Sequence, residues 1–307
     1  MSLTDKIRCI FGCLFPRFAI RVNFLRKTGR LPDLRHPRDL NEKIQWLKLH
    51  TDPGTWAALA DKYRVREFVA SRGLGDTLVP LLGKFDTVDE FAAAWEGLEA
   101  PFVIKANNSS KTVLTVRDKS SVNLQQICRT LSGWLSDRLF WGFYVEPHYK
   151  YIKPCIVVER FLEQTGLPAE DSGTLVDYKV WCFNGRLECI WACTNRRGRS
   201  VEVRTYSPEW VPVQGADKPT AHYRAMEREL PAPECLQRML DVASRLSEGF
   251  PEVRVDLYCT DGHVYFGEMT FSSNGGFMDF HTPEYLLKLG SLCELPEKVL
   301  NLQDDCK

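Results

Sequence analysis

Residues 253–270 read Val-Arg-Val-Asp-Leu-Tyr-Cys-Thr-Asp-Gly-His-Val-Tyr-Phe-Gly-Glu-Met-Thr and predict a β-hairpin. Two runs rich in β-branched and aromatic residues flank Asp261-Gly262, and an Asp-Gly pair between such runs is a strong hairpin signal. Arg254, Asp256 and Glu268 interrupt the apolar pattern. These charges are either a polar stripe on the solvent face of an antiparallel sheet or a site where two carboxylates act together.

The register of this hairpin distinguishes the two interpretations. A two-residue turn would place Asp256 opposite the residue before Glu268 and send the two acids to opposite faces, because side chains alternate with a period of two. A three-residue loop from Asp261 to His263, with a bulge, would place the acids directly opposite each other. We expect the longer loop, with both acids and Arg254 on one face. Carboxylates whose Cβ atoms lie about 5 Å apart repel unless a cation lies between them, and oxygen ligands favour Mg²⁺.

A second hairpin is predicted over residues 102–105 and 112–116, which are short apolar runs. Lys105 ends the first run, and the polar connection after it includes Ser110 and Lys111. Backbone N–H groups of such a turn can cover a phosphate while the lysine neutralises its charge. The commoner arrangement is a lysine that ends a strand and reaches solvent.

The run from Cys155 to Glu159 predicts a buried strand, followed by Arg160, Phe161 and Leu162. A connection of this composition between two lobes can contact adenine through backbone groups, with apolar side chains on either side of the ring. The four candidate residues are Glu159, Arg160, Phe161 and Leu162.

Lys179 is a cation inside an otherwise apolar strand predicted over residues 178–183. An ammonium group is costly to bury without an anion, so a partner is required. That partner is an anionic ligand, or simply Asp177 or Glu188.

The chain divides by pattern into a helical region over residues 1–75, a first α+β lobe over 76–157 and a second over 158–307. Helical periodicity is clearest over 41–49 and 57–70, and no internal repeat or low-complexity linker separates the parts. Further expected elements are helices over 123–135 and 233–248 and strands over 187–193 and 201–206.

Taken in order, these segments resemble the ATP-grasp superfamily, and more closely the TupA-like ATP-grasp family associated with polysaccharide and teichuronopeptide biosynthesis. The resemblance spans nearly the whole chain. It rests on residues 40–48, 60–63 with Val65-Arg66, 102–105, 149–154, 177–179, 183–185 and 265–268. It implies an α+β ATP-grasp fold in which two α+β lobes clasp a nucleotide, preceded by the helical N-terminal region.

The resemblance also implies cofactors and roles. ATP and Mg²⁺ are the expected cofactors. Lys105 and Lys179 are expected on the phosphates, the segment from Glu159 to Leu162 on adenine, Asp256 and Glu268 on the metal, and Arg254 at the acyl phosphate. The implied reaction converts a carboxylate and ATP to an acyl phosphate, which an amine attacks to give an amide. Cations and metal stabilise the transferring phosphoryl group while the closed cleft excludes water.

Two departures from the family pattern affect these expectations. The connection after Lys105 holds no glycine, so Ser110 and Lys111 are expected to donate where backbone N–H groups otherwise would. Thr270 stands where many ATP-grasp enzymes carry a metal-binding Asn, and Asn274 is the candidate substitute.

Several functions fit this pattern. The leading one is a carboxylate–amine ligase of cell-surface polysaccharide or peptide-polymer biosynthesis, with a carboxylate on a small molecule or polymer and an amino acid as its substrates. A phosphotransferase on the same fold is an alternative. A glycosyltransferase is another, although the chain has no D-x-D motif to hold a sugar nucleotide through a metal. A non-catalytic nucleotide-binding module is the fourth.

The charges do not indicate a nucleic-acid partner, because 40 basic and 40 acidic residues cancel. The first thirty residues are an exception, with Lys6, Arg8, Arg17, Arg21, Arg26, Lys27 and Arg30 against the lone Asp5. Apolar residues recur there at helical spacing, which permits peripheral contact with a membrane surface. The simpler expectation is a terminal helix packed on the body of the protein.

Eleven cysteines are scattered without a C-x-x-C pair or zinc spacing, and an odd number argues against a complete disulfide framework. Reduced thiols in the cytoplasm are therefore expected. No stretch approaches the roughly 20 apolar residues that a membrane-spanning helix needs.

Overall fold

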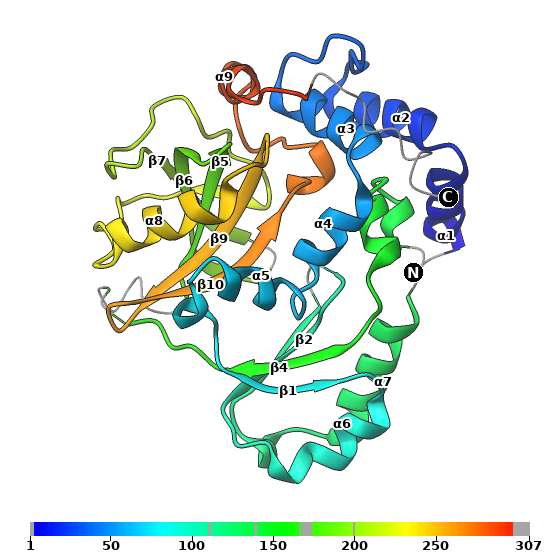
Figure 1. Cartoon of the computed structure of the whole chain (residues 1–307), viewed down its shortest axis with the longest axis vertical. Coiled ribbons are helices and arrows are strands. Elements are labelled where there is room, and N and C mark those ends of the chain that lie inside the picture. Colours follow the sequence, from blue (N-terminus) through cyan, green and yellow to red (C-terminus); the bar gives the residue numbers. More distant parts are fainter. Residues whose placement is uncertain are drawn as a thin grey trace.

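The computed structural model describes residues 3–109, 112–137, 140–165, 167, 174–198 and 200–296. Over this part of the chain two β-sheets lie on either side of a cleft that residues of both sheets line, and helices from the N-terminal region lie along one side of the sheets (Figure 1). The expected division at residues 75 and 157 stays a proposal about domain organisation.

Five α-helices begin the chain: α1 Leu3–Leu14, α2 Pro16–Thr28, α3 Leu40–His50, α4 Pro53–Ala60 and α5 Val65–Ser71. Asp39 caps α3 by accepting the N–H of Glu42. The single helix expected over 57–70 is wrong. It is interrupted because the side chain of Asp61 accepts the backbone N–H groups of Tyr63 and Arg64, which competes with continued helix.

The smaller sheet is antiparallel in the order β1-β4-β2-β3. Its strands are β1 Leu81–Phe85, β2 Phe102–Ala106, β3 Val113–Val116 and β4 Ile156–Arg160, and its helices are α6 Val88–Ala94 and α7 Leu124–Ser136. Phe102 and Ile104 are fully buried in a core with Phe91 and Leu131 of the helices. Because side chains alternate, Lys105 lies on the opposite face of β2, toward the cleft. The predicted hairpin of β2 and β3 is confirmed.

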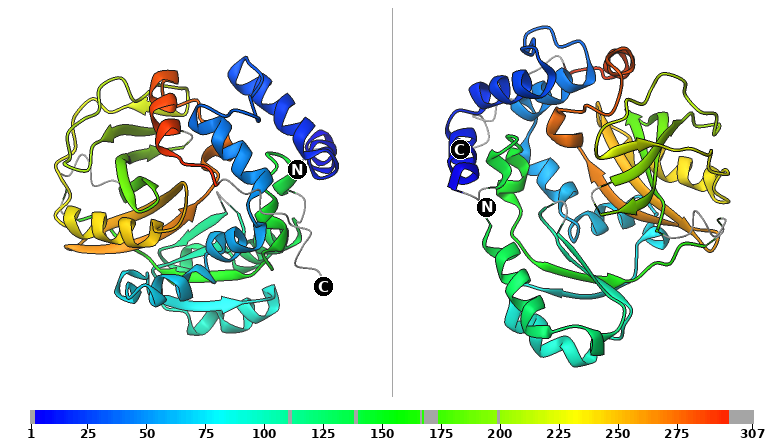
Figure 2. Two further views of the ribbon diagram at one scale, coloured as in Figure 1. Left: turned by 45° about the horizontal axis from the view of Figure 1, so that its top comes forward. Right: turned by 180° about the vertical axis from the view of Figure 1, so that it is seen from behind.

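The larger sheet has the order β10-β9-β5-β6-β7-β8 and is antiparallel except where β8 joins β7. Its strands are β5 Asp177–Phe183, β6 Arg186–Arg197, β7 Ser200–Tyr206, β8 Tyr223–Ala225, β9 Val253–Thr260 and β10 His263–Thr270. Helix α8 Leu236–Ser247 packs on this sheet, and α9 Pro283–Leu292 packs against α3 (Figure 2). Short 3₁₀ helices cover Gly75–Thr77 (η1), Trp95–Gly97 (η2), Lys119–Ser121 (η3), Phe140–Gly142 (η4), Pro147–Tyr151 (η5) and Ser273–Gly276 (η6).

Of the two expectations for the hairpin of β9 and β10, the pairing of the acids is confirmed and the length of the turn is wrong. Asp256 pairs directly with Glu268, as predicted. The three-residue loop is wrong, because Thr260 pairs with His263 and leaves the two-residue turn Asp261-Gly262, with φ of 53° and 66°. A bulge between Phe266 and Glu268 instead restores the alignment of the acids.

Gly267 is the residue that the bulge leaves unpaired. A Cβ atom at this position would lie 3.0 Å from the carbonyl oxygen of Asp256 and 3.1 Å from the ring of Tyr258. The bulge therefore favours a residue without a side chain where the two strands come closest.

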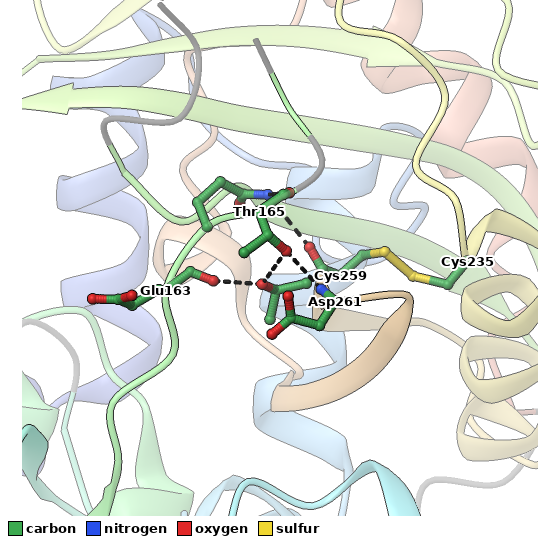
Figure 3. The surroundings of a disulfide bond; sticks show 7 residues. Glu163, Thr165, Cys235, Cys259 and Asp261 are labelled. Carbon is green, nitrogen blue, oxygen red and sulfur yellow. Dashed lines mark hydrogen bonds between the residues drawn. A yellow bond between two sulfur atoms is a disulfide. The ribbon is translucent and has the colours of Figure 1, made fainter. Parts of the chain in front are cut away.

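Cys235, directly before α8, and Cys259 of β9 form a disulfide (Figure 3). The hydroxyl groups of Thr165 and Thr260 lie 2.9 Å apart beside it, and Thr165 accepts the N–H of Asp261 at 2.7 Å. This pair corrects the expectation that all thiols are reduced, since an odd cysteine count speaks only against a complete framework. The free cysteines among the described residues are Cys9, Cys13, Cys128, Cys155, Cys182, Cys189, Cys193 and Cys293.

Within the described ranges, none of the helices is both long enough and apolar enough to cross a bilayer.

The contact between α9 and the segment before α3 generates a stability prediction. A Cβ atom on Gly290 would lie 2.2 Å from the carbonyl oxygen of Arg38, and backbone cannot easily yield. Gly290→Ala should lower the free energy of unfolding in urea by roughly 1–3 kcal/mol. The matched control is Gly133→Ala in α7, where nothing lies within 4 Å. It should raise stability by roughly 0.5–1 kcal/mol, and equal effects of the two variants would contradict the packing described.

Candidate active site between the two sheets

A cavity of about 470 Å³ lies between the sheets. Val103 and Lys105 of β2, the segment from Arg160 to Gln164 and Tyr258 of β9 line it. Apolar walls with a few polar groups are typical of a site for a planar ring. Phe161 and Leu162, predicted at adenine, lie in this wall.

Glu159 is not among the described residues that line this cavity, and its expected contact with adenine stays a prediction. It is buried on β4 between two cations, with Lys105 Nζ at 2.7 Å from Oε2 and Arg66 Nη1 at 3.1 Å from Oε1. Strand pairing accounts for the contact with Lys105, because Glu159 pairs with Val103 and therefore lies on the same face of the sheet as Lys105. Arg160 lines the cavity and donates to the hydroxyl of Tyr265 at 2.7 Å.

Two of the predicted phosphate-binding residues, Ser110 and Lys111, lie outside the described residues. Their expected contacts with nucleotide stay predictions.

A buried charge cluster lies on the larger sheet, where β5, β9 and β10 run side by side. Arg254 donates from Nε to Asp256 Oδ1 at 2.6 Å and from Nη2 to Oδ2 at 2.7 Å. Lys179 pairs with Asp177 at 2.6 Å and also with Asp256. The anion that Lys179 requires is thus present within the chain, while Glu188 pairs with Lys288 instead.

Glu268 occupies the more open side of this cluster. Its Oε1 lies 3.4 Å from Arg254 Nη2 and 3.2 Å from the hydroxyl of Thr270, and its Oε2 lies 3.8 Å from Lys62 Nζ. Burial raises the pKa of Glu268, but Lys62, Lys179 and Arg254 outweigh burial and lower the pKa to about 2. Glu268 is therefore a carboxylate at neutral pH.

Glu268 and Asp256 differ in how freely their carboxylate oxygens could bind Mg²⁺. Glu268 is 36% exposed, whereas Asp256 is 2% exposed and both its oxygens accept from Arg254. Across the described ranges no three His, Cys, Asp or Glu side chains converge as in a metal cage. Mg²⁺ is usually held by one or two carboxylates together with substrate phosphates. The pair fits an ion of that kind, which arrives with nucleotide, better than an ion bound by protein alone.

A second cavity, of about 560 Å³, borders the cluster. Lys179, Arg254 and Glu268 line one end of it, and Asn274 lies in the same lining. Asn274 donates to the carbonyl of Phe277 at 2.8 Å. The aromatic side chains in the lining are Phe143, Tyr144, Tyr149, Trp191, Tyr223 and Phe280.

Glu146 lines this second cavity away from the cluster, and sequence reasoning missed it. It accepts from the hydroxyl of Ser272 at 2.6 Å. Burial raises its pKa, while the buried Lys48 lowers it, and the net shift is upward. Lys48 donates to the carbonyls of Tyr144 and Gly275 at 2.7 and 2.8 Å. No local pattern marks Glu146, since its partners come from distant parts of the chain.

Lys62 was also missed as a site residue, although it lies in a stretch that carried the family resemblance. Its Nζ donates to the carbonyl of Ser109 at 2.8 Å and approaches Glu268. Burial lowers its pKa, against the opposing effect of Glu268. Lys62 thereby links the strand connection after Lys105 to the acidic pair.

A family model described as TupA-like ATPgrasp matches residues 42–294 of the chain. The chain belongs to this family, whose fold is the ATP-grasp fold. The fold class and family expected from the sequence are confirmed.

Solved structures with similar folds include three synthetases and ligases. N5-carboxyaminoimidazole ribonucleotide synthetase in complex with ADP is 12% identical over 75% of this chain and 50% of its own, with a TM-score of 0.42. D-Alanine–D-alanine ligase from Helicobacter pylori is 12% identical over 84% and 69% of the two chains, with a TM-score of 0.44. L-Amino acid ligase from Bacillus licheniformis is 14% identical over 89% and 55%, with a TM-score of 0.42.

This chain thus spans about half the length of the first of these proteins. Comparison with curated proteins finds no match.

The charge cluster predicts that replacing Asp256 and replacing Glu268 lower the free energy of unfolding by unequal amounts. Asp256→Asn leaves Lys179 and Arg254 buried with less compensation and should lower the free energy of unfolding by roughly 3–5 kcal/mol. Glu268→Gln, at the more exposed position, should cost less, roughly 1–2 kcal/mol, because solvent weakens the attraction of Glu268 to Lys62 and Arg254. Urea denaturation at pH 7 measures both. A larger cost for Glu268→Gln than for Asp256→Asn would contradict the assignment of Asp256 as the central anion.

Proposed function

We propose that this protein is an ATP-dependent ligase that joins a carboxylate to an amine through an acyl phosphate. The observation that carries the proposal is that Lys179, Arg254 and Glu268 line a polar and aromatic cavity, while a separate cavity with a mixed apolar and polar lining lies next to Lys105. A nucleotide in the first cavity and an acceptor in the second would meet at this cluster.

The nucleotide part of the proposal places adenine against Phe161 and Leu162. Lys105 would then contact phosphate oxygens, with Ser110 and Lys111 as further donors and Lys179 on the terminal phosphate. Lys105 is held by Glu159 in this structure, so a phosphate would share or replace that partner. Arg66 can keep Glu159 neutralised when Lys105 turns to the phosphates.

Mg²⁺ would be held by Glu268 and Asp256, with Asn274 as a third candidate ligand. The ion supplies charge neutralisation for the transferring phosphoryl group. Arg254 contacts both acids, so its guanidinium would lie close to the acyl phosphate. Glu268 supports the metal assignment because it is ionised and lines the cavity.

The second cavity supports an acceptor of mixed character. Its aromatic walls suit the face of a sugar ring or an apolar side chain, and Glu146 with Ser272 suits the ammonium group of an amino acid. The link to cell-surface polysaccharide or peptide-polymer biosynthesis rests on the association of the TupA-like family with such pathways.

The need for ATP favours the cytoplasm as the location of this reaction. The disulfide between Cys235 and Cys259 is the observation against it, since structural disulfides are rare in reducing compartments.

The nucleotide assignment predicts a selective loss of affinity. Lys105→Met should weaken ATP binding in the presence of Mg²⁺ by roughly 10- to 100-fold, the value of a charge-assisted hydrogen bond. The matched control is Lys119→Met, because Lys119 is half-buried like Lys105 but contacts Trp95 and Glu96 beside the smaller sheet. Isothermal titration calorimetry measures both. Equal affinities for the two variants would place the phosphates elsewhere.

The ligase assignment predicts an acyl phosphate that hydroxylamine traps. With ATP, Mg²⁺ and a panel of uronic acids and amino acids, the productive carboxylate should give ADP and a hydroxamate. Glu268→Gln should lower both products by at least about 100-fold, while Glu188→Gln, whose partner is Lys288 outside the cavities, should not. ADP release with a phosphorylated hydroxyl product and no hydroxamate would instead identify a kinase. Absence of turnover across the panel, with ATP bound, would favour a non-catalytic module.

A further inference from the structure

Helices α1 and α2 carry a concentration of exposed apolar side chains. Nine of the sixteen large apolar side chains exposed in the described part of the chain lie within residues 3–25. They are Leu3, Ile7, Ile10, Phe11, Leu14, Phe15, Phe18, Val22 and Leu25, with exposed fractions between 36% and 76%. We call this set the N-terminal ridge. Helices α1 and α2 therefore pack on the body of the protein through one side only, and the ridge on their other side is exposed.

The ridge faces away from the rest of the protein. Ile7, Phe11 and Leu14 are spaced as on one side of a helix, and the opposite side of α1 buries Cys9 and Gly12. Gly12 packs so closely on η4 that a Cβ atom would meet the carbonyl of Gly142. This contact fixes which side of α1 points outward. Figure 2 shows both helices at the edge of the molecule.

The two helices form one continuous ridge. Phe18, Val22 and Leu25 share a side of α2 at the same helical spacing. The ring of Phe11 in α1 lies 5.4 Å from that of Phe15 and 5.7 Å from that of Phe18. Aromatic contacts thus bridge the turn between the helices, and the apolar side chains are presented together.

Basic side chains flank the ridge. Lys6, Arg17, Arg21, Arg26 and Lys27 are exposed, and Arg8 stacks on the ring of Phe143 at 4.3 Å. Asp5 is the sole acidic residue in the described stretch 3–30. At helical spacing Arg21 and Arg26 lie on either side of the stripe formed by Phe18, Val22 and Leu25. Apolar side chains bordered by cations on a helix lying flat are the pattern of an interfacial membrane helix.

We propose that the N-terminal ridge docks on an anionic lipid bilayer. The charge pattern selects this occupant over a second copy of the chain, because a two-fold contact through the ridge would bring two strongly basic faces together. A cavity of about 280 Å³ between α1, α2 and the segment of Phe143 and Tyr144 is lined by Arg8, Arg26 and Lys27 and can receive a lipid phosphate. Asp5 of α1 also lines the second cavity of the candidate active site, so docking through α1 would bring that cavity near the bilayer surface.

The proposal is tested by vesicle co-sedimentation of the full chain. It should bind vesicles that contain phosphatidylglycerol and phosphatidylcholine, and bind pure phosphatidylcholine at least about tenfold more weakly. Arg21→Gln with Arg26→Gln should weaken binding to the anionic vesicles by roughly 25-fold, about fivefold for each charge removed. Phe18→Asp with Val22→Asp should abolish binding, since apolar insertion is lost.

Matched controls use exposed positions elsewhere. Val211→Asp and Leu287→Asp remove apolar side chains that are 59% and 49% exposed, and Arg129→Gln removes a charge from α7. All three should bind the anionic vesicles like the unaltered protein. Circular dichroism and ATP binding identify ridge variants that fail to fold, and ridge variants limited to Phe18→Ser and Val22→Ser then replace them.

Three results would overturn the proposal. One is absence of binding to anionic vesicles, and another is equal binding by ridge and control variants. The third is a dimer in analytical ultracentrifugation that Phe18→Asp with Val22→Asp dissociates, because a second copy would then cover the ridge.

Discussion

The alignment of the central strands depends on a buried ion cluster around Asp256. Lys179 on β5 pairs directly with Asp256 on β9, which pairs directly with Glu268 on β10. A slip of one residue on β9 would set Lys179 against Val255 or Leu257 and leave a buried cation without its anion, which is costly. The charges that the proposed chemistry needs are therefore also the charges that specify the register. Removing them for a change of activity is expected to disturb the sheet that holds the site.

Much of the fold could be predicted because each element shows a local pattern. The hairpin of β2 and β3, the helix α7 and the strands around Lys179 follow from alternation, periodicity and turn residues. The pairing of Asp256 with Glu268 was also predicted, from the expectation that the two acids act together on one cation. The turn was not, although both signals were present: Asp261-Gly262 favours two residues, and Gly267 inside a strand marks a bulge. A bulge at Gly267 aligns the acids with the two-residue turn in place, so the longer loop is not needed.

The rest of the site could not be predicted because it is built from contacts between distant residues. Glu146 meets Ser272 across 126 positions, and Lys62 meets Glu268 across a longer stretch. The position of Glu159 depends on which face of β4 lies toward the cleft. The sequence of β4 alone does not show which face that is. Periodicity in α1 likewise reveals an apolar side without revealing that Gly12 turns it outward. Local pattern defines elements, and tertiary packing decides what they face.

The bulge at Gly267 restricts how the β9–β10 hairpin can change in length. Adding or deleting one residue between Asp256 and Glu268 would place the two acids on opposite faces of the sheet, whereas a change of two residues would keep them on the same face. A single deletion at Gly267 could be offset only by a single insertion in the turn. Length variation in this hairpin should therefore occur in even steps, or in compensated pairs of odd ones. The number of residues between the two acids in a related chain therefore shows whether its acidic pair is still aligned on one face.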